Sequence, residues 1–413
     1  MIPDLYITNI KGLAQVYKNP PQCVSGSAMD EIPSITNAFL AVKNGFIHSF
    51  GRMEDLRLQG KEEVINAHDR FVLPAFVDSH THLVYAGSRE TEFVDKIRGL
   101  SYAEIASRGG GILNSAKKLR ATSAEELLIE AYARAMEVMT TGTGTVEIKS
   151  GYGLDPTNEL KILRVIKKLE KDLPLKIKAT FLGAHAFPEN VSREYYIDQI
   201  INEMVPAVAE ENLATFIDVF CEEGFFNVEE SERILEAGKR YGLQPKVHAN
   251  QLHVSGGVQL GIKTGAISVD HLESIGREEI EALKKSNVVP TLLPGAAFFL
   301  NSKMPPAREL IEAGLPVAIA SDYNPGSSPS GNMQMMLSLA CVLLRMTPNE
   351  GLNAMTINGA YAMNTPSGVI SQGRPADLII TKKIPSLHFM PYSYGTNNIE
   401  KVLLDGMVVA DNP

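Results

Sequence analysis

The chain has 413 residues, of which 44% are hydrophobic and 21% charged, so it can bury a large core and is not expected to be disordered as a whole. Its 39 basic and 48 acidic residues give a formal net charge of −9 without long runs of one sign, which argues against a nucleic-acid partner. A cytoplasmic protein that does not cross a membrane is expected, because the sequence lacks a run of about 18 apolar residues, a secretory signal pattern at MIPDLYITNIKG, and a disulfide-like set among Cys23, Cys221 and Cys341.

The two ends of the chain are predicted to form short strands and turns. In AFLAVKNGFIHSFG, Asn44-Gly45 separates two apolar runs, which predicts a hairpin because both residues tolerate positive φ. Near the other end, ADLIIT and KVLLDGMVVA favour strands, and Asp405-Gly406 predicts a second hairpin turn. We expect residues 1–70 and 375–413 to pair into one small β-sandwich domain; two separate fraying tails are the alternative.

Between these ends, apolar runs alternate with helical stretches. The expected buried strands are 71–78, 144–149, 177–183, 216–221, 245–249, 266–271, 288–293 and 316–321. Capping boxes at 123–126 and 347–350 predict helix starts, the second with Pro348 at the first helical position. Buried strands that alternate with helices indicate a parallel sheet. Eight of them favour a (β/α)8 TIM barrel over residues 71–374 rather than an open doubly wound sheet.

Several of the nine histidines fall at the expected strand ends. His80 and His82 follow the first strand, His185 follows the third, His248 lies in the fifth, His271 ends the sixth, and Asp322 follows the eighth. Catalytic residues of such barrels lie at the carboxyl ends of strands, so these side chains should converge on one rim. His80 and His82 are two residues apart on a strand, so their imidazoles should project to the same side.

Imidazoles and one carboxylate suit a borderline divalent metal, zinc or iron before calcium or magnesium. The His80/His82 pair at a strand end, with His248 and Asp322 converging on the same rim, is the main evidence for such a site. For His185 or His271 taken singly, a purely structural role stays open. The histidines away from expected barrel strand ends are assigned structural roles: His48, His68, His253 and His388.

The segments around these residues also resemble a known family. Six segments are similar, in chain order, to the successive site segments of the imidazolonepropionases, which are metal-dependent amidohydrolases. They are VDSHTHLVYAGSRE, EIKSGYGL, FLGAHAFP, VHANQL, SVDHLE and SDYNPGSS. GRPADLII resembles the closing strand motif of amidohydrolases whose end domain is built from both termini. The similarity covers essentially the whole barrel and both ends. Within the wider superfamily, the match is narrowed to the imidazolonepropionases by four shorter segments taken together: AGSRE, SGYG, LGAHA and DYNPGSS.

The resemblance implies a role for each matching residue. The implied ligands of one metal ion are His80, His82, His248 and Asp322. The implied substrate contacts are Arg89, Tyr152 and His185, with Asn324, Gly326 and Ser327 lining the pocket after the last strand. Gln251 stands where the family has Glu or Gln, and its amide can hold the substrate ring but cannot transfer a proton near neutral pH. His271 would stand behind the ligands or carry a proton beside the metal.

The resemblance further implies a hydrolase that opens the ring of 4-imidazolone-5-propanoate with a metal-activated water, giving N-formimidoyl-L-glutamate in histidine degradation. A bound metal lowers the pKa of its water toward about 7 and stabilises the oxyanion. Asp322 or His271 would take the water's proton and deliver it to the departing nitrogen. Arg89 would hold the propionate through a bidentate fork. The identity and charge of the ion stay open: it would be divalent or trivalent, either zinc or iron. A homodimer is one option for the oligomeric state.

Three alternatives compete with this interpretation. Amidohydrolases with two metals use a modified lysine at the end of strand four; here that strand ends in Cys221-Glu222-Glu223, so one metal is favoured, although Glu222 could bridge a second. A deaminase on the same barrel shares the ligands, but Gln251 and the Arg89 clamp count against it. A non-catalytic barrel used for assembly would be expected to have lost ligands.

Overall fold

The computed structural model describes residues 3–58, 60, 62–100, 104 and 110–412. One of its two sheets is the expected barrel, whose eight strands are all parallel and follow one another in chain order. These strands are β6 (Phe76–Asp78), β7 (Thr143–Lys149), β8 (Lys176–Ala184), β9 (Phe216–Cys221), β10 (Gln244–Ala249), β11 (Ser268–His271), β12 (Val289–Leu292) and β13 (Ala318–Ile319).

The barrel closes through backbone hydrogen bonds just beyond its first and last strands. The Asp322 N–H donates to the His80 carbonyl at 3.0 Å, and the His82 N–H donates to the Tyr323 carbonyl at 2.9 Å. The segment after β13 therefore returns to the segment after β6. The expected (β/α)8 barrel is confirmed.

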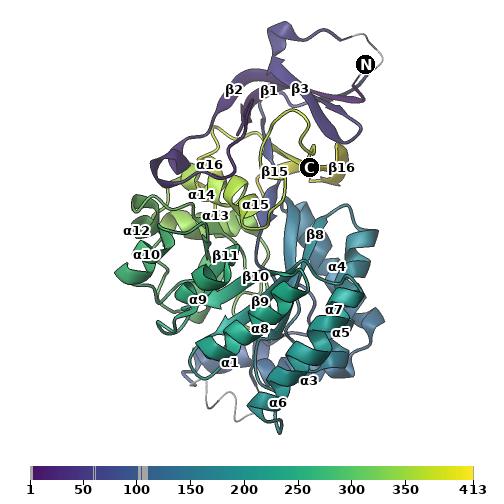
Figure 1. The fold of residues 1–413 in the computed structure, drawn as a ribbon. Coiled ribbons are helices and arrows are strands. Elements are labelled where there is room, and N and C mark those ends of the chain that lie inside the picture. Colours follow the sequence, from purple (N-terminus) through teal and green to yellow (C-terminus); the bar gives the residue numbers. More distant parts are fainter. Residues whose placement is uncertain (1–2, 59, 61, 101–103, 105–109, 413) are drawn as a thin grey trace.

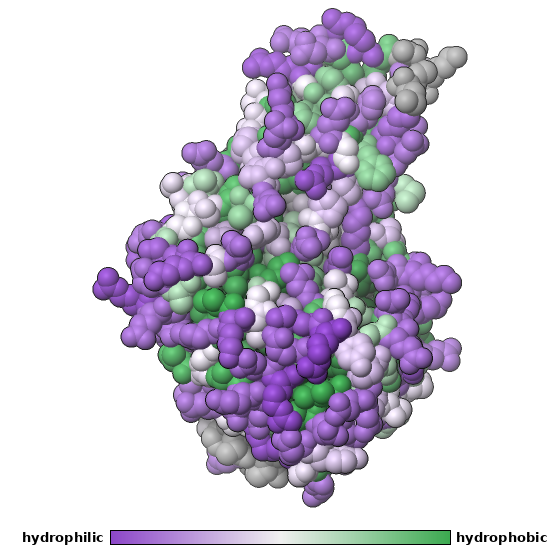
Figure 2. Space-filling view, in the orientation of Figure 1, coloured by the Kyte–Doolittle hydropathy of each residue, from purple (hydrophilic) through white to green (hydrophobic). Residues whose placement is uncertain are grey.

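Helices surround this sheet. In chain order they are α1 (Glu90–Ile97), α3 (Ile112–Ala121), α4 (Ala124–Thr140), α5 (Pro156–Asp172), α6 (Arg193–Gln199), the π-helix η3 (Ile200–Met204), α7 (Val205–Glu210), α8 (Val228–Arg240), α9 (Gly257–Thr264), α10 (Arg277–Leu283), α11 (Pro294–Leu300), α12 (Ala307–Glu312), α13 (Met333–Val342), α14 (Pro348–Ala354), α15 (Ile357–Tyr361) and α16 (Phe389–Tyr392). Ser123 and Thr347 cap α4 and α14 in the predicted capping boxes. The face in Figure 2 is mostly hydrophilic, with smaller apolar areas between the purple side chains. Within the described ranges, the helices are too short or too polar to cross a bilayer.

The second sheet joins both ends of the chain and is called the terminal sheet below. Its strands are β1 (Leu5–Ala14), β2 (Ser34–Lys43), β3 (Phe46–Arg52), β4 (Glu63–Asn66), β5 (Phe71–Pro74), β14 (Leu378–Thr381), β15 (Ile399–Leu404) and β16 (Met407–Asp411), with 3-10 turns η1 (Gly26–Asp30) and η2 (Met53–Asp55) between them. The antiparallel pair β5–β14 unites the two ends in one mixed sheet with its own core. Figure 1 shows both termini at this end of the molecule. Both predicted turns are confirmed, with positive φ at Asn44-Gly45 and Asp405-Gly406.

The predicted strand 71–78 is in fact two strands in different sheets. The Ala75 N–H donates to the Asp377 carbonyl in the terminal sheet, whereas the Phe76 N–H donates to the Gly142 carbonyl beside the barrel, each at 2.9 Å. The chain therefore changes sheets between these two residues. The domain bounds at 70/71 and 374/375 stay a prediction, and this pairing favours a first boundary near Ala75.

The terminal sheet packs against the amino ends of the barrel strands. Lys176, the first residue of β8, forms ion pairs with Asp377 and Asp405 of the terminal sheet. Gly144 at the start of β7 lies so close to Leu404 that an added Cβ would be 2.9 Å from its side chain. The carboxyl ends of the strands are thus at the opposite end of the barrel.

Candidate active site and metal centre

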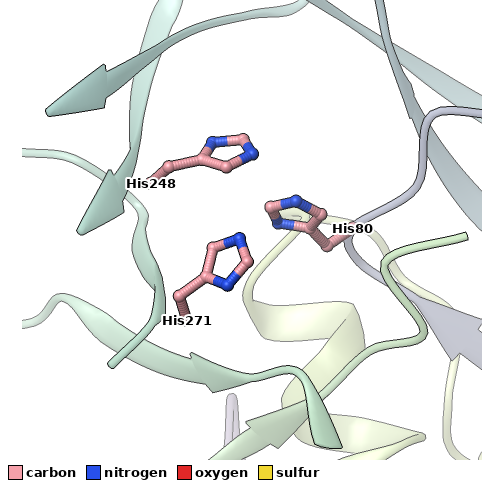
Figure 3. A group of neighbouring side chains, drawn as sticks. All are labelled: His80, His248 and His271. Atoms are coloured by element: carbon pink, nitrogen blue, oxygen red, sulfur yellow. The ribbon is translucent and has the colours of Figure 1, made fainter. Parts of the chain in front are cut away.

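The predicted metal ligands and His271 converge at the carboxyl ends of the barrel strands. His80 and His82 follow β6, His248 is near the end of β10, His271 ends β11 and Asp322 follows β13. All five side chains are buried. The ring centroid of His248 lies 4.5 Å from that of His80 and 5.3 Å from that of His271, and the three rings gather around a common space in Figure 3.

Ligand atoms in this cluster form two overlapping groups that could hold a metal ion. His80, His82 and Asp322 make one group, and His80 and His248 make another with His271. Asp322 Oδ1 lies 3.5 Å from His80 Nε2 and 3.7 Å from His82 Nε2. Two ligands of a tetrahedral zinc ion, each about 2.0–2.2 Å from it, are roughly 3.3–3.6 Å apart. The spacing of Asp322 from the two histidines fits a shared ion, and a ring nitrogen of His271 lies within 4.8 Å of those of His80 and His248.

Hydrogen bonding around two of the histidines also fits a metal. His80 Nε2 is buried and has no hydrogen-bond partner among the residues that the structure describes, while Nδ1 of the same ring lies 2.6 Å from Asp270 Oδ2. His248 Nδ1 lies 2.9 Å from Asp218 Oδ2, an ion-pair distance at an angle that does not make a hydrogen bond. Metal-binding histidines commonly engage a carboxylate with one ring nitrogen and the metal with the other. The donor set therefore suits an ion bound by the Nε2 atoms.

Burial sets the protonation of these side chains. It lowers the pKa of His80 and of His82 well below the usual value, with nearby cationic and imidazole groups acting in the same direction. Both rings are thus neutral near pH 7 and can act as ligands. Burial also acts to lower the pKa of His271, but the carboxylates of Glu273, 3.4 Å from Nδ1, and of Asp322 and Asp270 together raise that pKa. His271 is therefore the ring of this cluster best suited to hold a proton.

The loop after β13 fixes the carboxylate of Asp322. Asp322 has a φ of 55°, a conformation that costs a non-glycine residue about 1–3 kcal/mol unless its surroundings hold it. Asn324 Nδ2 donates to the Asp322 carbonyl at 2.7 Å, and Ser327 Oγ donates to Asp322 Oδ2 at 2.9 Å. Asn324 and Ser327 therefore support Asp322. That they also line the substrate pocket stays a prediction.

Arg89 lies next to the same loop. Its guanidinium donates from Nε at 2.8 Å and from Nη2 at 2.6 Å to Glu92 Oε2, so this edge of the fork is already used. A Cβ at Gly326 would overlap Arg89 Nη1, which shows that the guanidinium lies against this glycine. The remaining Nη1 edge is the one left to meet a substrate carboxylate, and that role stays a prediction.

Tyr152 and His185 extend the cluster on the side of His82. The ring of His185 stacks on that of His82 with centroids 5.2 Å apart, and the buried Tyr152 ring is 5.8 Å from His82 and 5.5 Å from His185. His185 Nδ1 lies 3.0 Å from the carbonyl of Gly151, whose φ of 113° favours glycine. Burial lowers the pKa of His185 to about 3, so its ring is neutral.

Gln251 and Glu222 lie at the rim after neighbouring strands. Gln251 is half-buried, and its side chain makes no hydrogen bond within the part of the chain that the structure describes, so the amide is left for a ligand. Glu222 accepts hydrogen bonds from the N–H groups of Leu252 at 2.8 Å and His253 at 3.3 Å, and its Oε1 lies 3.1 Å from the His253 ring. Its carboxylate therefore holds this loop, which supports a single metal ion over a second one at Glu222.

Sequence reasoning missed the charged side chains beneath the histidines. These are Glu147, Lys149, Asp218, Lys246 and Asp270, all fully buried inside the barrel. A signal was present, because Glu147 and Lys149 alternate with apolar residues in TVEIK, and Lys246 has the same spacing to His248. Alternating positions of a strand share one face, so a charged residue two positions from a candidate ligand points to the same interior.

A family model described as "Amidohydrolase family" matches residues 71–409, which is most of the chain. This chain belongs to the amidohydrolase family. Among its curated relatives are proteins named imidazolonepropionase. The one from Flavobacterium johnsoniae is 54% identical over 407 residues, covering 98% of this chain and 99% of that protein. The one from Thermoanaerobacter pseudethanolicus is 42% identical over 408 residues, covering 98% and 97%.

Solved structures of a hydrolase and a deaminase share the fold. A triazine hydrolase variant superposes with a TM-score of 0.77 at 16% identity, covering 99% of this chain and 95% of that chain. An adenosine deaminase from Xanthomonas campestris with bound zinc gives a TM-score of 0.70 at 16% identity, covering 99% and 93%. At this identity the likeness shows the barrel and the terminal sheet alone. Family membership and the His/Asp cluster together make this amidohydrolase an enzyme with a site for a divalent metal.

Proposed function

We propose that this amidohydrolase opens the ring of 4-imidazolone-5-propanoate by hydrolysis, giving N-formimidoyl-L-glutamate in histidine degradation. Relatives of full length carry the name imidazolonepropionase. The observation that carries the proposal is one continuous chain of contacts from the His80–Asp322 cluster through Ser327 and Gly326 to Arg89. Such a site offers hydrolytic groups at one end and a cation at the other. The substrate, a cyclic amide with a propionate tail, has the matching two ends.

The metal would be held by His80, His82, His248 and Asp322, as one ion, zinc or iron. When bound, it supplies a Lewis acid that acidifies a water and polarises the ring carbonyl. Asp270 would orient the His80 ring, and Asp218 would orient the His248 ring. The lowered pKa values of His80 and His82 keep these two rings neutral, so their nitrogen lone pairs are free to bind.

Protons and substrate are handled by other side chains of the site. His271, whose pKa is raised by Glu273 together with Asp322 and Asp270, is the group that we assign to carry a proton to the departing ring nitrogen. Asp322 is the carboxylate of the proposed ligand set. Tyr152, His185 and the Gln251 amide would contact the ring. Arg89 would bind the propionate with the Nη1 edge that Glu92 leaves open.

The proposal also covers the partners, the cellular location and the oligomeric state of the enzyme. The partner is the small-molecule substrate, with neither nucleic acid nor a membrane involved. The three cysteines are free thiols, as is usual in a reducing compartment, which supports a cytoplasmic location. A homodimer remains the oligomeric state to be tested by size-exclusion chromatography with light scattering.

The decisive experiment incubates the purified enzyme with imidazolone propionate and measures the product mass. Hydrolysis adds one water and releases no ammonia, whereas a deaminase would release ammonia. His82→Ala should lose metal and activity together, because three remaining ligands hold the ion poorly. His68→Ala, whose side chain is 67% exposed in the terminal sheet, should keep both. Unchanged substrate, or full activity in a metal-free preparation, would contradict the proposal.

A further inference from the structure

A group of ionisable side chains fills the barrel interior below the candidate metal ligands, and the function proposed above uses only two of its members, Asp218 and Asp270. Glu147 and Lys149 project from β7, Asp218 from β9, Lys246 from β10 and Asp270 from β11, and each is 0% exposed. Burying a charge is costly unless it is paired and hydrogen-bonded. A buried set of this size therefore stays ionised only if its members hold one another in place.

Lys149 is the centre of this group. Its Nζ lies 2.7 Å from Glu147 Oε1, 2.7 Å from Asp218 Oδ2 and 3.8 Å from Asp270 Oδ2. Lys246, on β10, contacts the same group: its Nζ lies 2.6 Å from Glu147 Oε2 and 2.8 Å from the Ser79 carbonyl. Glu147 thus links the two lysines, one through each oxygen.

Two carboxylates of this group are the partners of predicted metal ligands. Asp218 Oδ2, which pairs with Lys149, is also the atom 2.9 Å from His248 Nδ1. Asp270 Oδ2 is 2.6 Å from His80 Nδ1 and 3.6 Å from Lys246 Nζ. Each carboxylate oxygen is therefore shared between an imidazole above it and an ammonium group below it.

We propose that Lys149 is a positioning residue for the metal centre, holding Asp218 in the place from which it fixes the His248 ring with Nε2 toward the metal. An ammonium group has three donors on a flexible stem, and here two of them are taken by Glu147 and Asp218. Without it, Asp218 Oδ2 loses the contact opposite His248 and is no longer held toward the ring. Asp218 Oδ1 still accepts hydrogen bonds from the N–H groups of Val219 at 2.7 Å and His248 at 3.1 Å, so the carboxylate stays anchored at one oxygen. The inference rests on the metal site proposed above and extends it to a residue that touches neither metal nor substrate.

The test measures metal binding directly. Replacing the partner of a metal ligand typically weakens metal binding about 10–100-fold. Lys149→Met, one contact further away, should weaken Zn²⁺ binding about tenfold in competition with a chelator, and Asp218→Asn should weaken it at least as much. In protein loaded with Co²⁺ instead, the visible absorption spectrum should change in both variants, because the orientation of a ligand ring changes.

Lys149→Met removes a cation from two buried carboxylates, those of Glu147 and Asp218, and the variant could fail to fold. The double variant Glu147→Gln/Lys149→Met removes one charge of each sign and keeps Asp218 without its ammonium partner, so it should fold and still bind Zn²⁺ more weakly. Arg308→Met is the matched control, since it removes a cation bonded at 2.9 Å to both oxygens of the buried Glu350, away from the site. It should lower stability and leave Zn²⁺ affinity and the Co²⁺ spectrum unchanged.

The outcomes separate the two proposals. Weaker Zn²⁺ binding and an altered Co²⁺ spectrum in the Lys149 variants, with the Arg308 control unchanged, supports the inference. Parent-like affinity and spectrum in the double variant overturns it, as does an equal loss in the Arg308 control. A parent protein that binds neither Zn²⁺ nor Co²⁺ overturns the metal site itself.

Discussion

Gly326 contributes to the site by lacking a side chain. The Arg89 guanidinium lies where a Cβ at residue 326 would be, while Glu92 holds the other edge of the fork. We therefore expect Gly326→Ala to push the guanidinium aside and raise KM for the substrate. Arg89→Ala should cost roughly ten- to a hundredfold in kcat/KM, since a hydrogen bond to a charged group is worth about 1.5–3 kcal/mol.

A double-mutant cycle checks whether the two residues act through one contact. If Gly326 matters only by making room for Arg89, the double variant Arg89→Ala/Gly326→Ala should have the same kcat/KM as Arg89→Ala alone. Fully additive losses would mean that the glycine has another role. Parent-like kinetics of Arg89→Ala would place the substrate carboxylate elsewhere.

His271 and Gln251 should differ in how much their removal costs. A general acid or base contributes about 10²–10⁴-fold, whereas a neutral hydrogen bond is worth about 0.5–1.5 kcal/mol, or roughly two- to twelvefold. His271→Ala should therefore lower kcat far more than Gln251→Ala, with metal retained in both. Metal analysis of each variant is the control. Loss of metal from His271→Ala would make this ring a ligand, as its place in the His80–His248 group allows.

The sequence predicted the residues that carry a motif and missed those defined by contacts in three dimensions. His80 and His82 could be found because their spacing and strand-end position point to a metal. Lys149 could not be assigned, because its partners Asp218 and Asp270 lie on other strands and their pairing depends on the barrel register. The support that Ser327 gives Asp322 depends in the same way on the fold of a loop.

At the scale of the elements, the joint between the first and last barrel strands carries a buried acid. Asp78 ends β6, and its carboxylate accepts hydrogen bonds from the Ser321 N–H at 3.0 Å and hydroxyl at 2.5 Å. Burial raises the pKa of Asp78 from 3.8 to about 7, although the bonds from Ser321 act against it. Asp78 therefore binds its proton more tightly in the folded state than in the unfolded state.

This shift predicts how stability depends on pH. The contribution of a group with a raised folded pKa is fully present below the unfolded pKa of 3.8 and is lost as pH rises to the folded value of about 7. The loss should approach roughly 4 kcal/mol at 1.36 kcal/mol per pKa unit. Urea unfolding of the parent and Asp78→Asn between pH 4 and 8 checks this, because the amide does not titrate. A parent–variant difference in unfolding free energy that stays constant with pH would contradict it.

Element existence was predictable, but exact element bounds were predictable only in places. The strand at 216–221 was predicted with its observed bounds, whereas 316–321 contains a strand of only two residues, β13. The apolar run PVAIAS extends beyond the paired residues, and hydrophobicity does not show where hydrogen bonding to a neighbour stops. For the same reason an apolar run could not show that the chain changes sheets at Ala75.

At the scale of the whole molecule, the terminal sheet and the active site lie at opposite ends of the barrel. Lys176→Met leaves the mostly buried Asp377 without its cation and should lower the free energy of unfolding by about 1–3 kcal/mol, less than for a fully buried pair because the Lys176 side chain is 27% exposed. Its kcat and KM should match the parent. Lys168→Met, which removes an exposed pair with Asp172, is the control and should cost less than about 1 kcal/mol. A changed kcat in Lys176→Met would show that the two ends are coupled.

The backbone joint between His80 and Asp322 has a consequence for the order in which the enzyme matures. These two residues are 322 − 80 = 242 positions apart in the chain, yet their main chains are hydrogen-bonded to each other and their side chains belong to one candidate ligand group. On the ribosome, His80 and His82 emerge long before Asp322 does. A nascent chain therefore offers an ion only some of these candidate ligands, and binding by the whole set would have to wait until translation has passed the last strand of the barrel.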